Sequence, residues 1–199
     1  MLLNPQVLHL QTIFLFLSTD FVTFFNFSLR TLSVDNQSLL TTLLDELKKM
    51  NMHNRDLYWT EAVNQCYDDD EIRYLLSDYI PNEENKRDDA YNKNFVELLC
   101  WTCSSSYPIV RTLAIRHLVT LLLRIPQYTV ELLMKFQQVD DAYVLDGLYS
   151  ALYGFVLMSD DKEKIGNIAK NIYEFSFKNK EPYPDLRVRE WMLRILDRD

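Results

Sequence analysis

The sequence predicts an all-α fold, a HEAT-like α-solenoid of antiparallel helix pairs with about nine to ten helices. Three observations predict it: a scarcity of glycine, apolar stripes of helical period, and a weak internal repeat. The chain holds only three glycines in 199 residues, which argues against hairpins and glycine-rich phosphate loops and favours helices joined by short polar links. With 48% hydrophobic residues, one continuous array can bury a core.

The internal repeat is carried by four segments that share a phase and follow turns rich in aspartate or proline: residues 71–75, 109–113, 143–148 and 187–191. Their equivalent aliphatic positions are Ile72, Val110, Val144 and Val188. The spacings of 38, 34 and 44 residues lie near the period of about 40 to 47 residues in paired-helix repeats. An arginine follows in three segments (Arg73, Arg111 and Arg189), whereas the third segment has Leu145. We expect these arginines to pack on the neighbouring unit and to donate to the adjoining turns.

The repeat unit is clearest in residues 107–158. A helix over 108–124 is predicted by apolar residues spaced three or four apart: Val110, Leu113, Ala114, Leu118, Leu121 and Leu122. Pro108 suits the first turn, where an amide has no partner, and Pro126 ends this helix and opens another over 127–137. Asp140 and Asp141 are expected to cap a third helix that ends at Met158.

Four helices are predicted before this unit, over 36–50, 56–66, 71–80 and 91–103. In the last of them the inward residues are expected to be Phe95, Leu98, Leu99 and Thr102. The acidic run Asp68–Glu71 lacks the glycine and the distant glutamate of a calcium loop, so it is interpreted as the cap of the 71–80 helix. Residues 81–89 are expected to form a charged surface loop.

Two helices are predicted after the unit. Ser159 or Asp160 should cap the first, which runs to Phe177. Its apolar stripe is Ile165, Ile168, Ala169, Ile172 and Phe175 or Ser176. The second runs over 186–196, with these apolar residues: Val188, Trp191, Met192 and Ile195. Because its outer face is not polar, this helix is expected to be followed by another.

The chain divides into an apolar N-terminal helical segment, residues 1–34, and a helical-repeat domain, residues 35–199. The first segment has no basic residue before Arg30, and its longest apolar run is Ile13–Leu17, so neither a secretory signal nor a membrane span is predicted. It is interpreted as helix buried against protein. Its exposed phenylalanines would need a neighbour, so we expect the chain to be a piece of a longer protein.

No residue is predicted to be catalytic, to bind a cofactor or to ligate a metal. Cys100 and Cys103 form a C-x-x-C near the end of a helix, where the helix dipole raises a thiol pKa instead of activating the thiol. A zinc site would have to recruit Cys66 and His117, a spacing that fits no compact zinc module. His53 and His117 are interpreted as capping or packing residues. No P-loop, G-x-G-x-x-G or G-x-S-x-G motif occurs, so no enzyme activity is expected.

The net charge of −8 makes a nucleic-acid partner unexpected, because such binding depends on neutralising phosphates. Acidic residues concentrate in residues 68–97 (net −6), whereas residues 162–199 carry +2. Three cysteines without a signal sequence predict a reducing compartment, which we take to be the cytoplasm.

From Arg55 onward the sequence resembles the helical-repeat region of large bacterial STAND-type ATPases of anti-phage defence. The matching residues are Arg55–Trp59, Trp101, Arg111 with Ala114, Val139–Leu145, Leu148-Tyr149, Tyr153-Gly154 and Arg189–Trp191. Glu190-Trp191 departs from the Asp-Tyr expected there. In that family a separate P-loop domain hydrolyses nucleotide, so the resemblance implies a scaffold or sensor segment and supplies no catalytic residue.

The sequence therefore predicts a non-enzymatic module for protein recognition or inter-domain scaffolding, the sensor or scaffold portion of a defence ATPase. Its expected partner is a protein or a neighbouring domain, with no membrane, nucleic acid or small-molecule substrate. Two alternatives stay open. One is a free-standing HEAT-like adaptor unrelated to defence, and the other is a DNA-binding HEAT protein, which would need a basic concave face.

Overall fold

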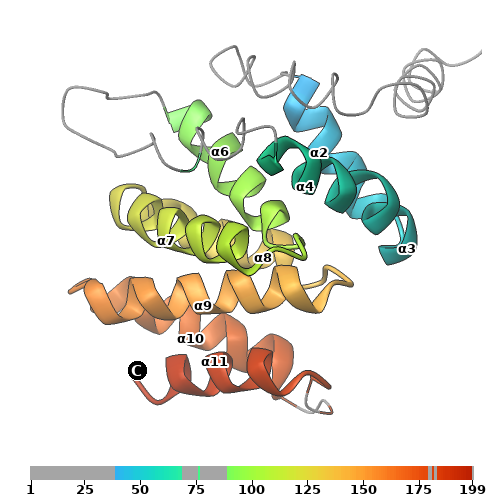
Figure 1. Ribbon diagram of the computed structural model, residues 1–199. Coiled ribbons are helices and arrows are strands. Elements are labelled where there is room, and N and C mark those ends of the chain that lie inside the picture. The colour runs from blue at the N-terminus through green and yellow to red at the C-terminus, as the bar shows by residue number, and fades with distance from the viewer. Residues whose placement is uncertain (1–38, 69–75, 77–88, 179–180, 182, 199) are drawn as a thin grey trace, which may run out of the picture.

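The computed structural model describes residues 39–68, 76, 89–178, 181 and 183–198, and Figure 1 shows their arrangement. The predicted all-α class is confirmed for these residues, among which no β-strand occurs. The N-terminal segment 1–34, most of the 71–80 helix, the 81–88 loop and the repeat arginine Arg73 lie outside the described residues.

The described helices are α2 (Leu39–Lys49), α3 (Met52–Arg55), α4 (Glu61–Asp68), α6 (Asp89–Thr102), α7 (Pro108–Arg124), α8 (Thr129–Phe136), α9 (Ala142–Met158), α10 (Lys162–Ser176) and α11 (Leu186–Leu196). A π-helical segment, Asp56–Thr60, joins α3 directly to α4, and a 3-10 turn, Pro126–Tyr128, precedes α8.

Helices α7 and α11 have the predicted bounds, and Asp141 caps α9 by accepting the amides of Tyr143 and Val144. The helix predicted from Asp56 starts earlier, at Met52, because the Asn51 side chain accepts the amide of Asn54 and caps it there. The predicted cap of α10 was wrong.

The cap of α10 is Asp161, whose carboxylate accepts the amide of Lys164 at 3.1 Å. Ser159 instead accepts the amide of Asp161, at 3.2 Å, and so orders the turn before the cap. Ser159, Asp160 and Asp161 are all residue types that cap helices, and the geometry of the turn places Asp161 at the cap position.

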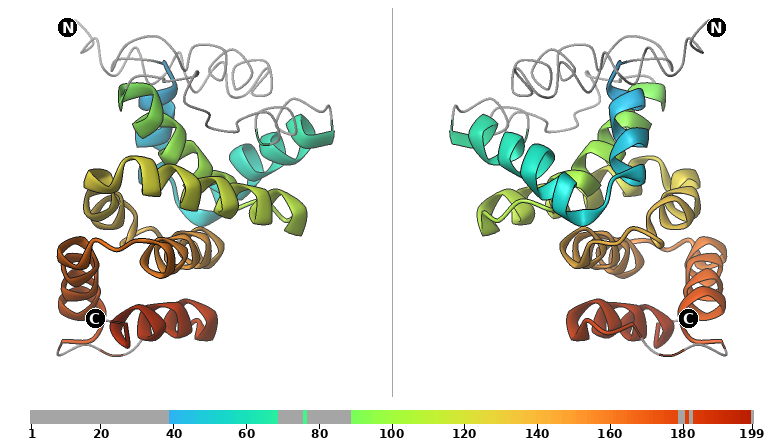
Figure 2. Two further views of the ribbon diagram at one scale, coloured as in Figure 1. Left: turned by 90° about the vertical axis from the view of Figure 1, so that its left-hand side faces the viewer. Right: turned by 90° about the vertical axis from the view of Figure 1, so that its right-hand side faces the viewer.

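From α7 onward the helices form two layers. Helices α7, α9 and α11 lie side by side in one layer, and α8 and α10 contact each other in the second layer (Figure 2). Helix α6 packs on α7, and α2 packs on α6. Each helix of the first layer therefore rests on the next helix but one along the chain.

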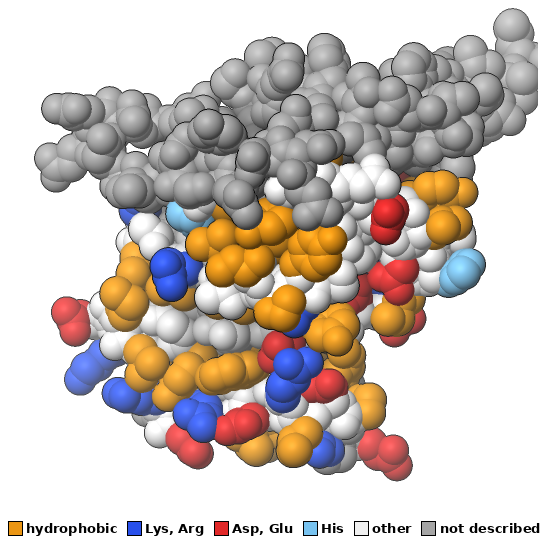
Figure 3. All heavy atoms as spheres, in the orientation of Figure 1, with side chains coloured by type: hydrophobic (Ala, Val, Ile, Leu, Met, Phe, Trp, Pro, Cys, Tyr) orange, Lys and Arg blue, Asp and Glu red, His pale blue; other side chains and the backbone are white. Residues whose placement is uncertain are grey.

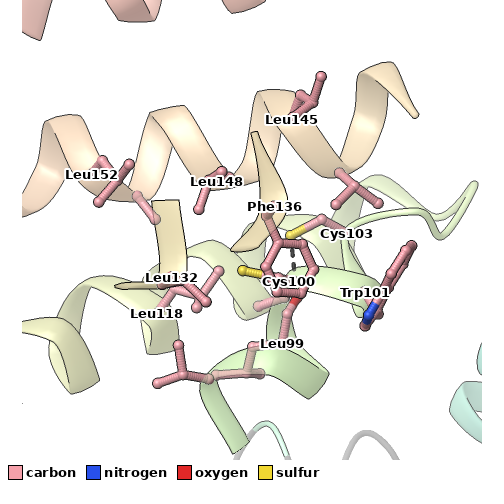
Figure 4. Packing of buried hydrophobic residues seen from close by; sticks show 14 of the residues in the cluster. Leu99, Cys100, Trp101, Cys103, Leu118, Leu132, Phe136, Leu145, Leu148 and Leu152 are labelled. Carbon is pink, nitrogen blue, oxygen red and sulfur yellow. Dashed lines mark hydrogen bonds between the residues drawn. The ribbon is translucent and has the colours of Figure 1, made fainter. Parts of the chain in front are cut away.

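The layers are held together by an apolar core that has α9 at its centre, and Figure 4 shows its packing against α6, α7 and α8. Helix α9 is buried along most of its length: Val144, Leu145, Leu148, Tyr149, Ala151, Leu152, Phe155 and Val156. The aliphatic repeat positions Val110, Val144 and Val188 are all fully buried, each in the first turn of its helix.

Two glycines let α9 approach its neighbours closely: Gly147 faces Cys103, just after α6, and Gly154 faces α7. A Cβ on Gly147 would lie 2.4 Å from the Sγ atom of Cys103, and one on Gly154 would lie 2.6 Å from a methyl carbon of Val119. Both distances are shorter than any ordinary contact between these atoms, so the packing of α9 against these neighbours depends on the absence of side chains there.

A buried arginine joins the N-terminal helices to the turn before α9. Arg55 is 2% exposed and donates to the carbonyl oxygens of Met50, at 2.5 Å, and Asp140. Its guanidinium lies 5.5 Å from the ring centre of Trp101, whose carbonyl accepts the indole N–H of Trp59 at 2.9 Å. This joint connects α3, the π-helical segment that follows it, α6 and the turn before α9.

A second polar joint connects α2, α6 and α8. The carboxylate of Glu97 is buried and accepts hydrogen bonds from the Tyr128 hydroxyl, at 2.6 Å, and from Lys135. Lys48 of α2 completes the group, and its pKa is lowered to about 8, first because burial disfavours its charge and second because Lys135 lies nearby. Both joints satisfy the charge of a buried side chain with several partners.

We expect Gly147→Ala to lower the free energy of unfolding by about 1 to 3 kcal/mol, because the new methyl group must displace Cys103 in a packed core. Urea denaturation measures the change. The matched control is Gly166→Ala in α10, which is partly exposed and should instead gain up to about 1 kcal/mol from helix propensity. A gain at both positions would show that α9 does not depend on a close approach to Cys103.

The lowered pKa of Lys48 predicts a pH dependence of stability. Between pH 8 and 10.5 the unfolded chain holds a proton on Lys48 that the folded chain has lost, so the free energy of unfolding should rise with pH in this window. Lys48→Met should remove this rise, measured as the difference between urea midpoints of the two proteins across the window. Lys49→Met, at an exposed position, should keep it. Parallel pH profiles for wild type and Lys48→Met would contradict the assignment.

Candidate interaction surface

The outward side of the α7–α9–α11 layer carries aromatic and arginine side chains in alternation. We call them the arginine–aromatic row: Arg111, Tyr143, Asp146, Tyr153, Arg187, Glu190, Trp191 and Arg194. Figure 3 views the molecule from this side. The row arises because α9 presents Tyr143, Asp146 and Tyr153 at helical spacing, opposite its buried face.

At one end of the row, the ring of Tyr143 lies between two guanidinium groups. That of Arg111, from α7, is 4.8 Å from the ring centre, and that of Arg187, from α11, is 5.8 Å away. Arg111 also donates to the carbonyl of Ser105 at 2.5 Å, so it makes both contacts expected of the repeat arginine. Tyr143 remains 42% exposed, which leaves part of this stack accessible.

At the other end, Trp191 of α11 is fixed against α9. Its indole N–H donates to a carboxylate oxygen of Asp146 at 2.9 Å, and its ring lies 5.6 Å from that of Tyr153. Arg194 lies 5.5 Å from the centre of the Trp191 ring and donates twice to Glu190, at 3.1 and 2.6 Å. Asp146 also reaches Arg187, at 3.6 Å, so it ties both ends of the row together.

The charge of this layer is opposite to that of the chain. Helices α7, α9 and α11 contain six arginines, no lysine and only two acidic residues, a net of +4. The whole chain carries −8. The layer that carries the row is therefore basic within an acidic protein.

The cysteines and histidines considered in the sequence do not form a site. Cys66, Cys100 and Cys103 are free and buried, and burial is the main cause that raises the pKa of the Cys100 and Cys103 thiols. His117 contacts the carbonyl of Leu76, and burial lowers its pKa; His53 is exposed. Among the described residues, no three His, Cys, Asp or Glu side chains are placed to hold a metal ion.

Sequence reasoning missed the row. It predicted Trp191 as an apolar residue of the final helix. In the structure Trp191 is partly buried, and its indole N–H donates to the carboxylate of Asp146. One available signal was the charge pattern, since these three helices contain arginine but no lysine. The other was the spacing of Tyr143, Asp146 and Tyr153 along one side of α9.

No helix in the described part of the chain combines the length and apolar character needed to cross a membrane. Comparison with known proteins found no matching protein family, no matching curated protein and no matching solved structure.

We expect Asp146→Ala to lower the free energy of unfolding by about 1 to 3 kcal/mol, because the Trp191 N–H and the Arg187 guanidinium both lose an acceptor. Urea denaturation followed by tryptophan fluorescence measures the change. Glu190→Ala removes a carboxylate from the same row, but that ion pair is exposed and should cost at most about 1 kcal/mol. Equal losses in the two variants would show that Asp146 does not hold α11 on α9.

Proposed function

We propose that this chain is a non-enzymatic helical-repeat module, a HEAT-like α-solenoid in the cytoplasm, which serves protein recognition or inter-domain scaffolding. The arginine–aromatic row is its binding surface. The observation that carries the proposal is the exposed stack of Tyr143 between Arg111 and Arg187, which draws on all three helices of one layer. Tyrosine, tryptophan and arginine are the residues most enriched at protein interfaces.

The helix arrangement supports a solenoid. Along the chain the helices alternate between two layers, with α7, α9 and α11 in the first layer and α8 and α10 in the second. Val110, Val144 and Val188 occupy the same buried position in their helices, as repeats of one unit would. Stacked repeats of this kind present an extended surface along one layer, and the row lies on such a surface.

The resemblance to defence ATPases supports the more specific part of the proposal, that the module is the sensor or scaffold portion of such a protein. The residues that carry the resemblance come together at structural joints: Arg55 contacts Trp101 and the carbonyl of Asp140, and Asp141 caps α9. Residues at joints define how the helices stack, which is what a shared scaffold requires. Nucleotide hydrolysis then belongs to another domain.

Site-specific photo-crosslinking in bacteria tests this function. A photoreactive residue in place of Ser150, which lies on the outward side of α9 between Tyr143 and Leu157, should capture a protein during phage infection. The same residue in place of Lys170, exposed on α10, should capture none. Capture of one partner at Ser150 regardless of infection would favour an adaptor unrelated to defence. No capture at Ser150, or equal capture at both positions, would contradict the proposal.

A further inference from the structure

We infer that the arginine–aromatic row takes an acidic segment of its protein partner, with guanidinium groups holding the carboxylates. This inference rests on the proposed function and specifies the chemistry of the partner. The first argument is the segregation of charge: the helices that form the row carry +4, while the chain as a whole carries −8. An acidic segment would be attracted to this layer and repelled by the rest of the molecule.

The second argument is that the guanidinium groups have donors to spare. Among the described residues, no carboxylate lies within ion-pairing distance of Arg111 of α7. Arg187 reaches the Oδ2 atom of Asp146 only at 3.6 Å, while the Oδ1 atom of Asp146 accepts from Trp191. Guanidinium donors match a carboxylate in a two-bond geometry, which a lysine cannot provide.

The third argument is pre-organisation. Arg111 is held by the carbonyl of Ser105 and by the ring of Tyr143, so binding would immobilise little that is free. The nearby aspartates at the helix starts are engaged elsewhere. Asp141 accepts the amides of α9, and Asp185 accepts those of Arg187 and Val188. These carboxylates therefore stabilise the helix ends and form no ion pair with the guanidinium groups of the row.

An acidic peptide fits this row better than a single-stranded nucleic acid. Bases bind by stacking on free aromatic faces, but Tyr143 already lies between two guanidinium groups, and Arg194 lies over Trp191. Two carboxylates, Asp146 and Glu190, also stand within the row and repel any negative charge placed opposite them. A nucleic-acid backbone carries a phosphate at every nucleotide, whereas a peptide can space its carboxylates to meet the arginines alone.

Fluorescence anisotropy with a labelled random copolymer of glutamate and tyrosine tests the inference on the full chain. We expect binding that weakens as salt is added, and that falls about tenfold in Arg187→Gln/Arg194→Gln, because two exposed arginines contribute about 0.7 kcal/mol each. Both residues are exposed, so the variant should fold, which circular dichroism checks. The matched control, Lys162→Gln/Lys170→Gln, removes the same charge from exposed positions on α10 and should bind as wild type does.

Three outcomes would overturn the inference: no binding of the copolymer, an equal loss in the arginine and lysine variants, or arginine-dependent binding of an oligothymidylate in its place. The failure of the proposed function is distinguishable from these. If Ser150 still captures its partner when Arg187 and Arg194 are both glutamine, the row binds protein through other chemistry. The function would then stand and the acidic partner would not.

Discussion

The structure depends on the burial of α9, which has too wide an apolar face to be covered by one neighbour. Buried side chains occupy most of its circumference, and α6, α7, α8 and α11 all pack against it. Only the strip with Tyr143, Ser150 and Leu157 stays outward. The same constraint that builds the core therefore also defines where a binding surface can exist. Gly147 and Gly154 complete the arrangement by letting Cys103 and α7 pack closely against α9.

Much of this fold could be predicted from the sequence, because helix ends and apolar stripes are local properties. The bounds of α7 and α11 and the cap at Asp141 follow from proline, aspartate and helical period alone. The stripe predicted for residues 91–103 was correct for Phe95, Leu98, Leu99 and Thr102, yet incomplete, since Val96, Cys100 and Trp101 are buried as well. Helix α6 is covered on several sides by partners that are distant in sequence, and a single stripe cannot reveal them.

The candidate surface could not be predicted, for a related reason. Arg111, Tyr143 and Trp191 belong to three helices, and each looks ordinary within its own segment. They form one surface only when α7, α9 and α11 lie side by side, with their first turns at one end of the layer. The most recognisable residues of the sequence, by contrast, turn out to be structural. Arg55 and Trp101 are buried, and they fix how the N-terminal helices meet α9.

The arginines of this chain therefore fall into two groups: one is buried and joins helices, and the other lies on the candidate surface. Arg55 is buried among carbonyl oxygens and an indole ring, and its guanidinium group holds these helices together. Arg111 and Arg187 use the same guanidinium chemistry on one exposed tyrosine, where part of their donor capacity stays free. The ring of Tyr143 holds both guanidinium groups in place. The excess positive charge of the layer favours a partner whose carboxylates the rest of this acidic chain would repel.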